Sequence, residues 1–241
     1  MHKSIQSVAP KMSAGQHPSP AKADTAADPG TASGRSGPIL DAAYELLEQH
    51  GLDGLTIRAV LMRTKLARRA FYERFSGKDD LLLAVFEHTI VLTVKHCAEQ
   101  VAAVSDPMQR LKLILTCLVQ GTKSLNDAER EQFNRRGAAM SREHMRLAES
   151  RPRDLQAALR PLIELICSQV REGMKTGQVR TCDPQFLATL LYNVVSTTAH
   201  ARFLAEEAAH LSRTRRVRVP RDDRLATEIW DFCRRAIASG E

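Results

Sequence analysis

The chain has 241 residues, enough to bury a sizeable core in one domain or two. Its net charge of +7 favours an anionic partner without separating DNA, RNA, a membrane surface or an acidic protein. No apolar run approaches the ~20 residues that span a bilayer, and the N-terminus lacks the apolar core of a signal peptide. Five widely spread cysteines without zinc-like spacing fit a reducing compartment. We therefore expect a cytoplasmic protein with no membrane partner.

Residues 1–37 are rich in Ser, Ala, Pro and Gly and have almost no periodic apolar positions. Such a segment cannot bury enough surface to offset the cost of ordering, so we predict a disordered N-terminal arm over residues 1–37. Its basic residues can contact a DNA minor groove. The alternative is an unstructured tail with little effect on function.

From Pro38 onward the pattern is helical. Pro38 suits a first helical position, and apolar residues then recur at the helical period until Gly51. Thr56 can cap a second helix ending near Arg63, and a third helix follows at about residues 67–74. The stretch Ser76-Gly77-Lys78-Asp79 has the form of a capping box, which predicts the start of a fourth helix.

The rest of the chain repeats this pattern. Asp106-Pro107 and Asp183-Pro184 each place a capping acid before a proline, and each opens a long apolar stripe. Between them one helix stops near residues 173–177, and a last helix follows residue 222. No run of alternating β-branched residues predicts a strand, so the expected fold class is all-α. The arginine-rich stretch at residues 213–221 is predicted as an exposed loop, with a second nucleic-acid or acidic-ligand contact as the alternative.

The most informative segment is the basic hairpin at residues 58–78, which holds seven basic residues against one acid, Glu73. Its size and spacing fit a helix-turn-helix, in which one helix crosses the DNA backbone while the next enters the major groove. Outward-facing Arg68 and Arg69 are placed nearest the groove, while Thr56 and Lys78 at helix N-termini are placed on phosphates. A solvated basic face is the alternative. The predicted contacts with double-stranded DNA are Thr56, Lys65, Ala67, Arg68, Arg69, Tyr72 and Lys78.

The sequence around this hairpin resembles that of a known protein family. The run from Ile39-Leu40-Asp41-Ala42-Ala43 through Leu55-Thr56-Ile57 to Leu66-Ala67-Arg68-Arg69-Ala70-Phe71-Tyr72-Glu73-Arg74-Phe75 resembles the DNA-binding region of TetR-type transcriptional regulators. The specific part covers about residues 38–86. By position, Thr56, Arg68, Tyr72 and Lys78 match family positions that often touch DNA.

The resemblance implies a three-helix DNA-binding head at residues 38–86 and a larger helical body at residues 87–241. The body would bind a small effector and form a homodimer through helices at about residues 184–207 and 222–238. It also implies a repressor that binds a palindromic operator and is released by its effector. Two departures stand out: Lys65 replaces the usual glycine of the turn, and Ala67 replaces the usual serine or threonine that caps the recognition helix.

An apolar or amphipathic effector is expected, although pocket and plain core are hard to separate by sequence. The candidate pocket residues lie on the central helices: Phe133, Met140, His144, Met145, Met174, Tyr192 and Phe203. His200 is a further histidine of interest. No catalytic motif, metal-ligand spacing or cofactor fingerprint is present, so we expect neither an enzyme nor a cofactor. A helical adaptor for an acidic protein and a helical enzyme with a hydrophobic substrate are the remaining alternatives.

Overall fold

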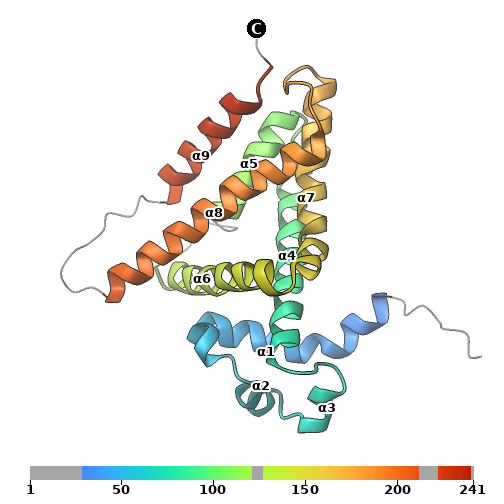
Figure 1. Cartoon of the computed structure of the whole chain (residues 1–241), viewed down its shortest axis with the longest axis vertical. Coiled ribbons are helices and arrows are strands. Elements are labelled where there is room, and N and C mark those ends of the chain that lie inside the picture. The colour runs from blue at the N-terminus through green and yellow to red at the C-terminus, as the bar shows by residue number, and fades with distance from the viewer. Residues whose placement is uncertain (1–28, 121–126, 212–221, 240–241) are drawn as a thin grey trace, which may run out of the picture. The chain divides into compact units, whose positions relative to one another are not determined.

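The computed structural model describes residues 29–120, 127–211 and 222–239. This part of the chain is all-α, as predicted, with one isolated antiparallel bridge between Val179 and Ala238. Residues 36–241 form one compact unit. In Figure 1 the helices are α1 (Pro29–Gly54), α2 (Ile57–Thr64), α3 (Arg68–Tyr72), α4 (Lys78–Val101), α5 (Pro107–Gln120), α6 (Asp127–Ser150), α7 (Pro152–Lys175), α8 (Pro184–Leu211) and α9 (Asp222–Ile237).

The first helix begins earlier than predicted. Helix α1 starts at Pro29, so residues 29–37 are helical and Pro38 lies inside the helix. Pro29 takes the role that the sequence pattern gives to Pro38, because proline fits a first helical turn, where the missing N–H costs nothing. Residues 1–28 lie outside the described residues, so the predicted arm is addressed only from Pro29 on. At Gly51 the backbone leaves helical geometry with φ of 66°, which matches the predicted end of the regular helix.

The N-terminal helices enclose a small apolar core, to which Ala139 of α6 also contributes. Buried side chains of α1 meet Val60 of α2, Phe71 of α3 and the first turns of α4. Phe71 and Phe75 contact each other with ring centroids 5.4 Å apart. These helices form the part called the head below.

Helix α4 runs from the head into the rest of the unit (Figure 1). Leu81, Leu82 and Val85 belong to the core of the head, whereas Leu83 packs against a second, larger core that contains the buried α4 residues from Phe86 onward. The predicted capping box is shifted by one residue: the backbone and hydroxyl of Ser76 donate to Asp80 rather than to Asp79. Four residues of spacing let the Asp80 side chain reach back over the first turn, whereas Asp79 points elsewhere.

By length and composition, α4 is apolar enough to cross a bilayer, with mean hydropathy of 1.4 over its most apolar window. The expectation that no run approaches spanning length is therefore wrong for this helix taken alone. Its buried apolar residues lie in the two cores, and α4 packs against α5 and α7, whereas Val91 and Leu92 are exposed. An amphipathic core helix accounts for the composition.

The larger core belongs to α4–α9 and is called the body below. Helix α7 packs on α4, α5 and α8, and it carries the longest run of buried apolar residues. It ends at Lys175 with Thr176 as the C-cap, and Gly177 follows with φ of 73°, a left-handed conformation that glycine adopts without strain. Helix α8 crosses α6 and α7, and the space between these helices holds the cavity described below.

Candidate nucleic-acid interface and ligand cavity

The turn between α2 and α3 has the geometry of a helix-turn-helix. Thr56 caps α2 as predicted, since its hydroxyl accepts the backbone N–H of Ala59 at 3.1 Å. At the other end of α2, Lys65 has φ of 56° and ψ of 24°. It is the one described non-glycine residue with positive φ, at the position where the resemblance expects glycine. The left-handed turn costs a lysine about 1 kcal/mol or more.

Helix α3 is short and weakly capped. Ala67 takes the N-cap position in extended geometry, and its methyl group makes no capping hydrogen bond. The cost relative to serine or threonine is about 1 kcal/mol. The helix is held by Phe71, which is fully buried, and by Arg74, whose guanidinium donates to the carbonyl of Ala70 at 2.6 Å.

The outer side of this hairpin is cationic and exposed. Arg68 lies 5.7 Å from the ring centroid of Tyr72, which is also exposed. Arg69 pairs with Glu73 at 3.0 Å in a highly exposed i,i+4 contact, which is worth only a few tenths of a kcal/mol. Within the described residues, Arg58, Lys65 and Arg68 form no ion pair with an acid. Their charge is directed at solvent and is available to an anion.

Lys78 lies differently from the other predicted contacts. It is half-buried, and its Nζ donates to the carbonyl of Leu52 at 3.3 Å, so it ties the start of α4 to the end of α1. The remaining predicted contacts, Thr56, Lys65, Ala67, Arg68, Arg69 and Tyr72, are all exposed. The structure thus gathers six of the seven predicted residues on the surface of the hairpin and gives Lys78 a structural contact as well. Residues 213–221, the predicted arginine-rich loop, lie outside the described residues.

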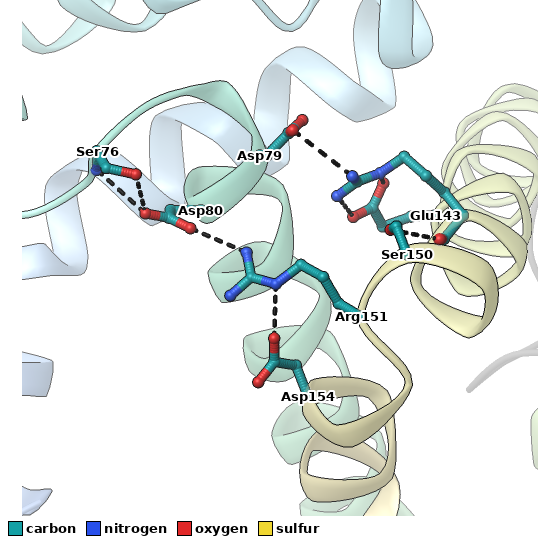
Figure 2. Close-up of polar contacts among 8 residues, drawn as sticks. Ser76, Asp79, Asp80, Glu143, Ser150, Arg151 and Asp154 are labelled. Atoms are coloured by element: carbon teal, nitrogen blue, oxygen red, sulfur yellow. Dashed lines mark hydrogen bonds and ion pairs between the residues drawn. The ribbon is translucent and has the colours of Figure 1, made fainter.

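Ion pairs join the start of α4 to the body (Figure 2). Arg151, at the start of α7, donates to Asp80 at 2.9 Å and to Asp154 at 2.6 Å. Arg146 of α6 pairs with the buried Glu143 at 2.6 Å and reaches Asp79 at 3.7 Å. Hydrogen bonds from Ser76 and then Arg151 hold the pKa of Asp80 below its usual range.

A cavity of about 360 Å³ lies in the body, within the size range of small-molecule sites. Its wall comes from α4, α5, α6, α7 and α8 and is mostly apolar. Polar groups are few and come mainly from Arg136, Ser141 and His144 of α6 and from Tyr192, Asn193, Ser196 and His200 of α8. An amphipathic small molecule matches this lining.

His144 and Tyr192 form the polar centre of the wall. Their rings stack with centroids 5.9 Å apart, and the Tyr192 hydroxyl lies 3.3 Å from His144 Nδ1. Burial and the neighbouring His200 lower the pKa of His144, so its ring is neutral at pH 7. Burial raises the pKa of Tyr192, which therefore stays protonated. His200 Nδ1 is buried without a hydrogen-bond partner among the described residues, so it offers an unused polar contact.

The structure brings together five of the seven residues predicted for a pocket: Met140, His144, Met145, Tyr192 and Phe203 line the cavity. Met174 lies away from it, packed against the core of the body, which is the alternative that the sequence left open. The side chain of Phe133 lies outside the described residues.

Sequence reasoning missed Arg136 as a cavity residue. A signal existed, because Arg136, Met140 and His144 are spaced four apart and therefore share one face of α6. Gly137 lies next to it where α6 meets Phe203, and a β-carbon there would collide with that ring.

The described cysteines are all free thiols. Cys97, Cys167 and Cys233 are buried, as expected of small apolar side chains, and burial raises the pKa of Cys233 to about 11. Cys117 contributes to the cavity wall. Among the residues with described positions, no group of three or more His, Cys, Asp or Glu side chains is arranged to hold a metal ion.

Residues 39–85 match the family model described as "Bacterial regulatory proteins, tetR family". Uncharacterized HTH-type transcriptional regulators from Mycobacterium bovis and Mycobacterium tuberculosis are 36% identical over 64 residues, or 27% of this chain. The chain spans about a third of the length of these curated relatives, 32%.

Solved structures share the fold over most of the chain. A TetR-family transcriptional regulator from Pectobacterium atrosepticum has 16% identity and a TM-score of 0.59, covering 87% of this chain and 93% of its own. RolR in complex with resorcinol has 16% identity and a TM-score of 0.61, covering 86% and 89%. FadR from Bacillus subtilis in complex with stearoyl-CoA has 13% identity and a TM-score of 0.60, covering 82% and 96%.

Proposed function

We propose that the chain is a transcriptional regulator of the TetR family that binds double-stranded DNA, because residues 39–85 match the model of that family and a solved TetR-family regulator shares the fold. The observation that carries this proposal is the exposed cationic face of α2, the turn and α3. Arg58, Lys65 and Arg68 have no acidic partner in the described structure, so binding a phosphate or a guanine would break no existing ion pair. A regulator of this kind works in the cytoplasm, where the DNA is.

The protein would act as a homodimer. On α8, exposed residues recur in steps of four and three, as in a coiled-coil seam: Phe186, Leu190, Asn193 and Thr197, with Leu204 one heptad further. Phe186 is 65% exposed, Leu190 46% and Leu204 45%, and on α9 Phe232 is 59% exposed. Apolar exposure of this extent on two neighbouring helices favours burial against a second copy. The two heads would then read an inverted repeat.

A small effector would bind in the cavity of the body and release the operator. The cavity has an apolar wall with few polar groups, and the similar folds of RolR and FadR hold resorcinol and stearoyl-CoA. Repression follows if the effector-free dimer is the form that occupies the operator.

Footprinting on the DNA upstream of the protein's own coding sequence tests this function. We expect one protected region with two inverted half-sites whose centres lie about 10 base pairs, or a multiple of that spacing, apart. Arg68→Ala should abolish the footprint at concentrations where Arg153→Ala, an exposed arginine of the body, retains it. Protection that spreads evenly over the DNA, or that persists in Arg68→Ala, would reject a sequence-reading head.

A further inference from the structure

Arg136 carries the one full charge among the described residues that line the cavity. The wall contains no described carboxylate, and His144 is kept neutral by burial. The Arg136 guanidinium contacts Glu48 and Tyr44, which do not line the cavity, so the charge lies at the edge of the site next to α1. A guanidinium at the edge of an apolar site favours an anionic group, and its planar fork fits a carboxylate with two parallel hydrogen bonds. The cavity therefore matches a ligand that has an apolar body and one acidic end.

Arg136 also contacts helix α1 of the head. Its guanidinium is hydrogen-bonded to the carboxylate of Glu48 on α1 and lies 4.9 Å from the ring centroid of Tyr44. The side chains of Arg136 and Glu48 are 22% and 25% exposed, so solvent screens the pair less than it screens the pairs on the head surface. Arg135 adds hydrogen bonds to the last carbonyls of the helix, those of Glu48 and Gln49. Arg135 and Arg136 thus both donate hydrogen bonds to the end of the regular part of α1.

This end of α1 is also in contact with α2. Arg63 of α2 pairs with Glu45 at 3.2 Å and donates to Gln49 at 2.9 Å. Helix α1 contributes buried residues to the core that supports α2 and α3. A continuous set of contacts therefore leads from the cavity through Arg136, Glu48 and α1 to the helices of the cationic face.

We propose that the effector is an organic acid with an apolar body, whose carboxylate binds Arg136 and competes with Glu48 for it. Loss of the Arg136–Glu48 pair loosens α6 from α1 and changes the position of the head, which lowers operator affinity. This mechanism rests on the proposed function, because it names the ligand class and the coupling contact of the same regulator. The ligand shifts the equilibrium because its carboxylate binds more tightly when Glu48 has released Arg136.

Matched compounds test the ligand class. The probes are linear acids of six to ten carbons and one- and two-ring aromatic acids, each paired with its primary amide of nearly equal shape. Binding is measured by calorimetry or thermal shift, and operator release by fluorescence anisotropy. We expect at least one acid to bind about tenfold or more tightly than its amide, since a charge-assisted bidentate contact is lost in the amide. A panel in which no acid exceeds its amide overturns the carboxylate assignment.

Variants of Arg136 test the residue. Arg136→Gln should remove the preference for acid over amide, and Arg136→Lys should retain part of it because the positive charge remains. Arg153→Gln is the control, an arginine of the body outside the cavity wall. A preference for the acid that survives in Arg136→Gln contradicts the proposal.

Variants of Glu48 test the competition. Glu48→Gln should bind the acid more tightly than the wild type does, because the competing carboxylate is gone, yet the acid should no longer change its operator affinity. Glu164→Gln, which breaks the exposed Arg171–Glu164 pair on α7, should respond to the acid like the wild type. A merely structural Glu48 would not tighten acid binding when it is replaced, so unchanged or weaker acid binding, or unchanged operator release, in Glu48→Gln overturns the mechanism.

Operator binding by the wild type without any probe distinguishes a failure of the proposed function from a failure of the ligand assignment. If the wild type binds no specific operator, the proposed function fails whatever the acids do. If it binds an operator but shows no acid preference, the function stands and only this ligand assignment fails.

Discussion

The arginines on the head surface differ in exposure and in acidic partners from those at the junction between head and body. On the hairpin, Arg68 is exposed and has no acidic partner among the described residues, and Arg69 makes only an exposed contact with Glu73. At the junction, Arg136 and Arg151 lie in partly buried pairs with Glu48 and Asp80. The Arg136 and Glu48 side chains are only 22% and 25% exposed, so removing one of them leaves the other charge poorly solvated. The exposed Arg68 is solvated by water without a partner. Under the proposed function, the exposed cations of the hairpin bind DNA, and the cations at the junction couple the body to the head.

Breaking the proposed dimer should lower operator affinity more than any other change, although every cation of the head and the junction stays in place. Leu190→Asp places a charge in the exposed α8 seam and should yield monomers in sedimentation velocity. Operator affinity measured by anisotropy should fall about 100-fold or more, since a single head loses the gain from joining two half-sites. Leu113→Asp, at an exposed leucine of α5, is the matched control and should remain dimeric. A dimeric Leu190→Asp protein would show that the interface lies elsewhere.

Removing one cation of the head is the next largest change. Arg68→Ala should weaken operator binding by about 1–3 kcal/mol and relax preference at one base position. Its thermal stability should stay near that of the wild type, because no described ion pair is broken. Arg153→Ala serves as the control in the body. If both variants bind alike, Arg68 does not face the DNA.

Substitutions of Lys65 test whether this lysine lowers the stability of the turn and at the same time contributes to DNA binding. Lys65→Gly should raise the free energy of unfolding by about 1 kcal/mol in urea titrations, because glycine adopts the left-handed conformation without strain. If Lys65 contacts a phosphate, the slope of log affinity against log salt should also shrink by about 1. Lys65→Asn, neutral but tolerant of this conformation, should give the same change in slope with a smaller gain in stability. An unchanged slope in both variants would assign Lys65 to the turn alone.

The smallest effect concerns Asp80 at the junction. Hydrogen bonds from Ser76 and Arg151 lower the pKa of Asp80 in the folded protein below its usual value of about 3.9. Its contribution to stability is therefore present above that pH and is lost as the pH falls through the lower folded value. Because the side chain is 37% exposed, Asp80→Asn should cost no more than about 0.5 kcal/mol at pH 7. Urea titrations of both proteins should converge below about pH 4, and a gap that widens there would contradict the assigned contacts.

Local sequence signals predicted the head well. The cap at Thr56, the turn at Lys65 and the buried pair Phe71 and Phe75 each follow from residues within one or two helical turns. The all-α class and the later helices followed from the same short-range periodicity. The start of α1 was misplaced because two prolines, Pro29 and Pro38, both suit a first turn and local pattern does not choose between them.

Contacts between distant segments could not be predicted in this way. The pair of Arg136 with Glu48 joins residues 88 apart, and that of Arg151 with Asp80 joins residues 71 apart. The sequence placed Met140, His144 and Tyr192 on the central helices as pocket candidates, without telling which residues line a cavity and which lie in plain core. Met174 has the same local pattern and lies in solid core. Packing between helices, which separates these cases, is not encoded within a single helix.

The central claim is that the head reads a specific DNA sequence, and a competition titration tests it most directly. The labelled duplex carries the footprinted site, and unlabelled competitors carry either that site or a scrambled sequence of equal composition, at about 150 mM salt. We predict that the site competes about 1,000-fold or more effectively than the scrambled duplex, the range of specific protein–DNA recognition. Equal competition by the two duplexes would contradict the account and leave only a non-specific cationic surface.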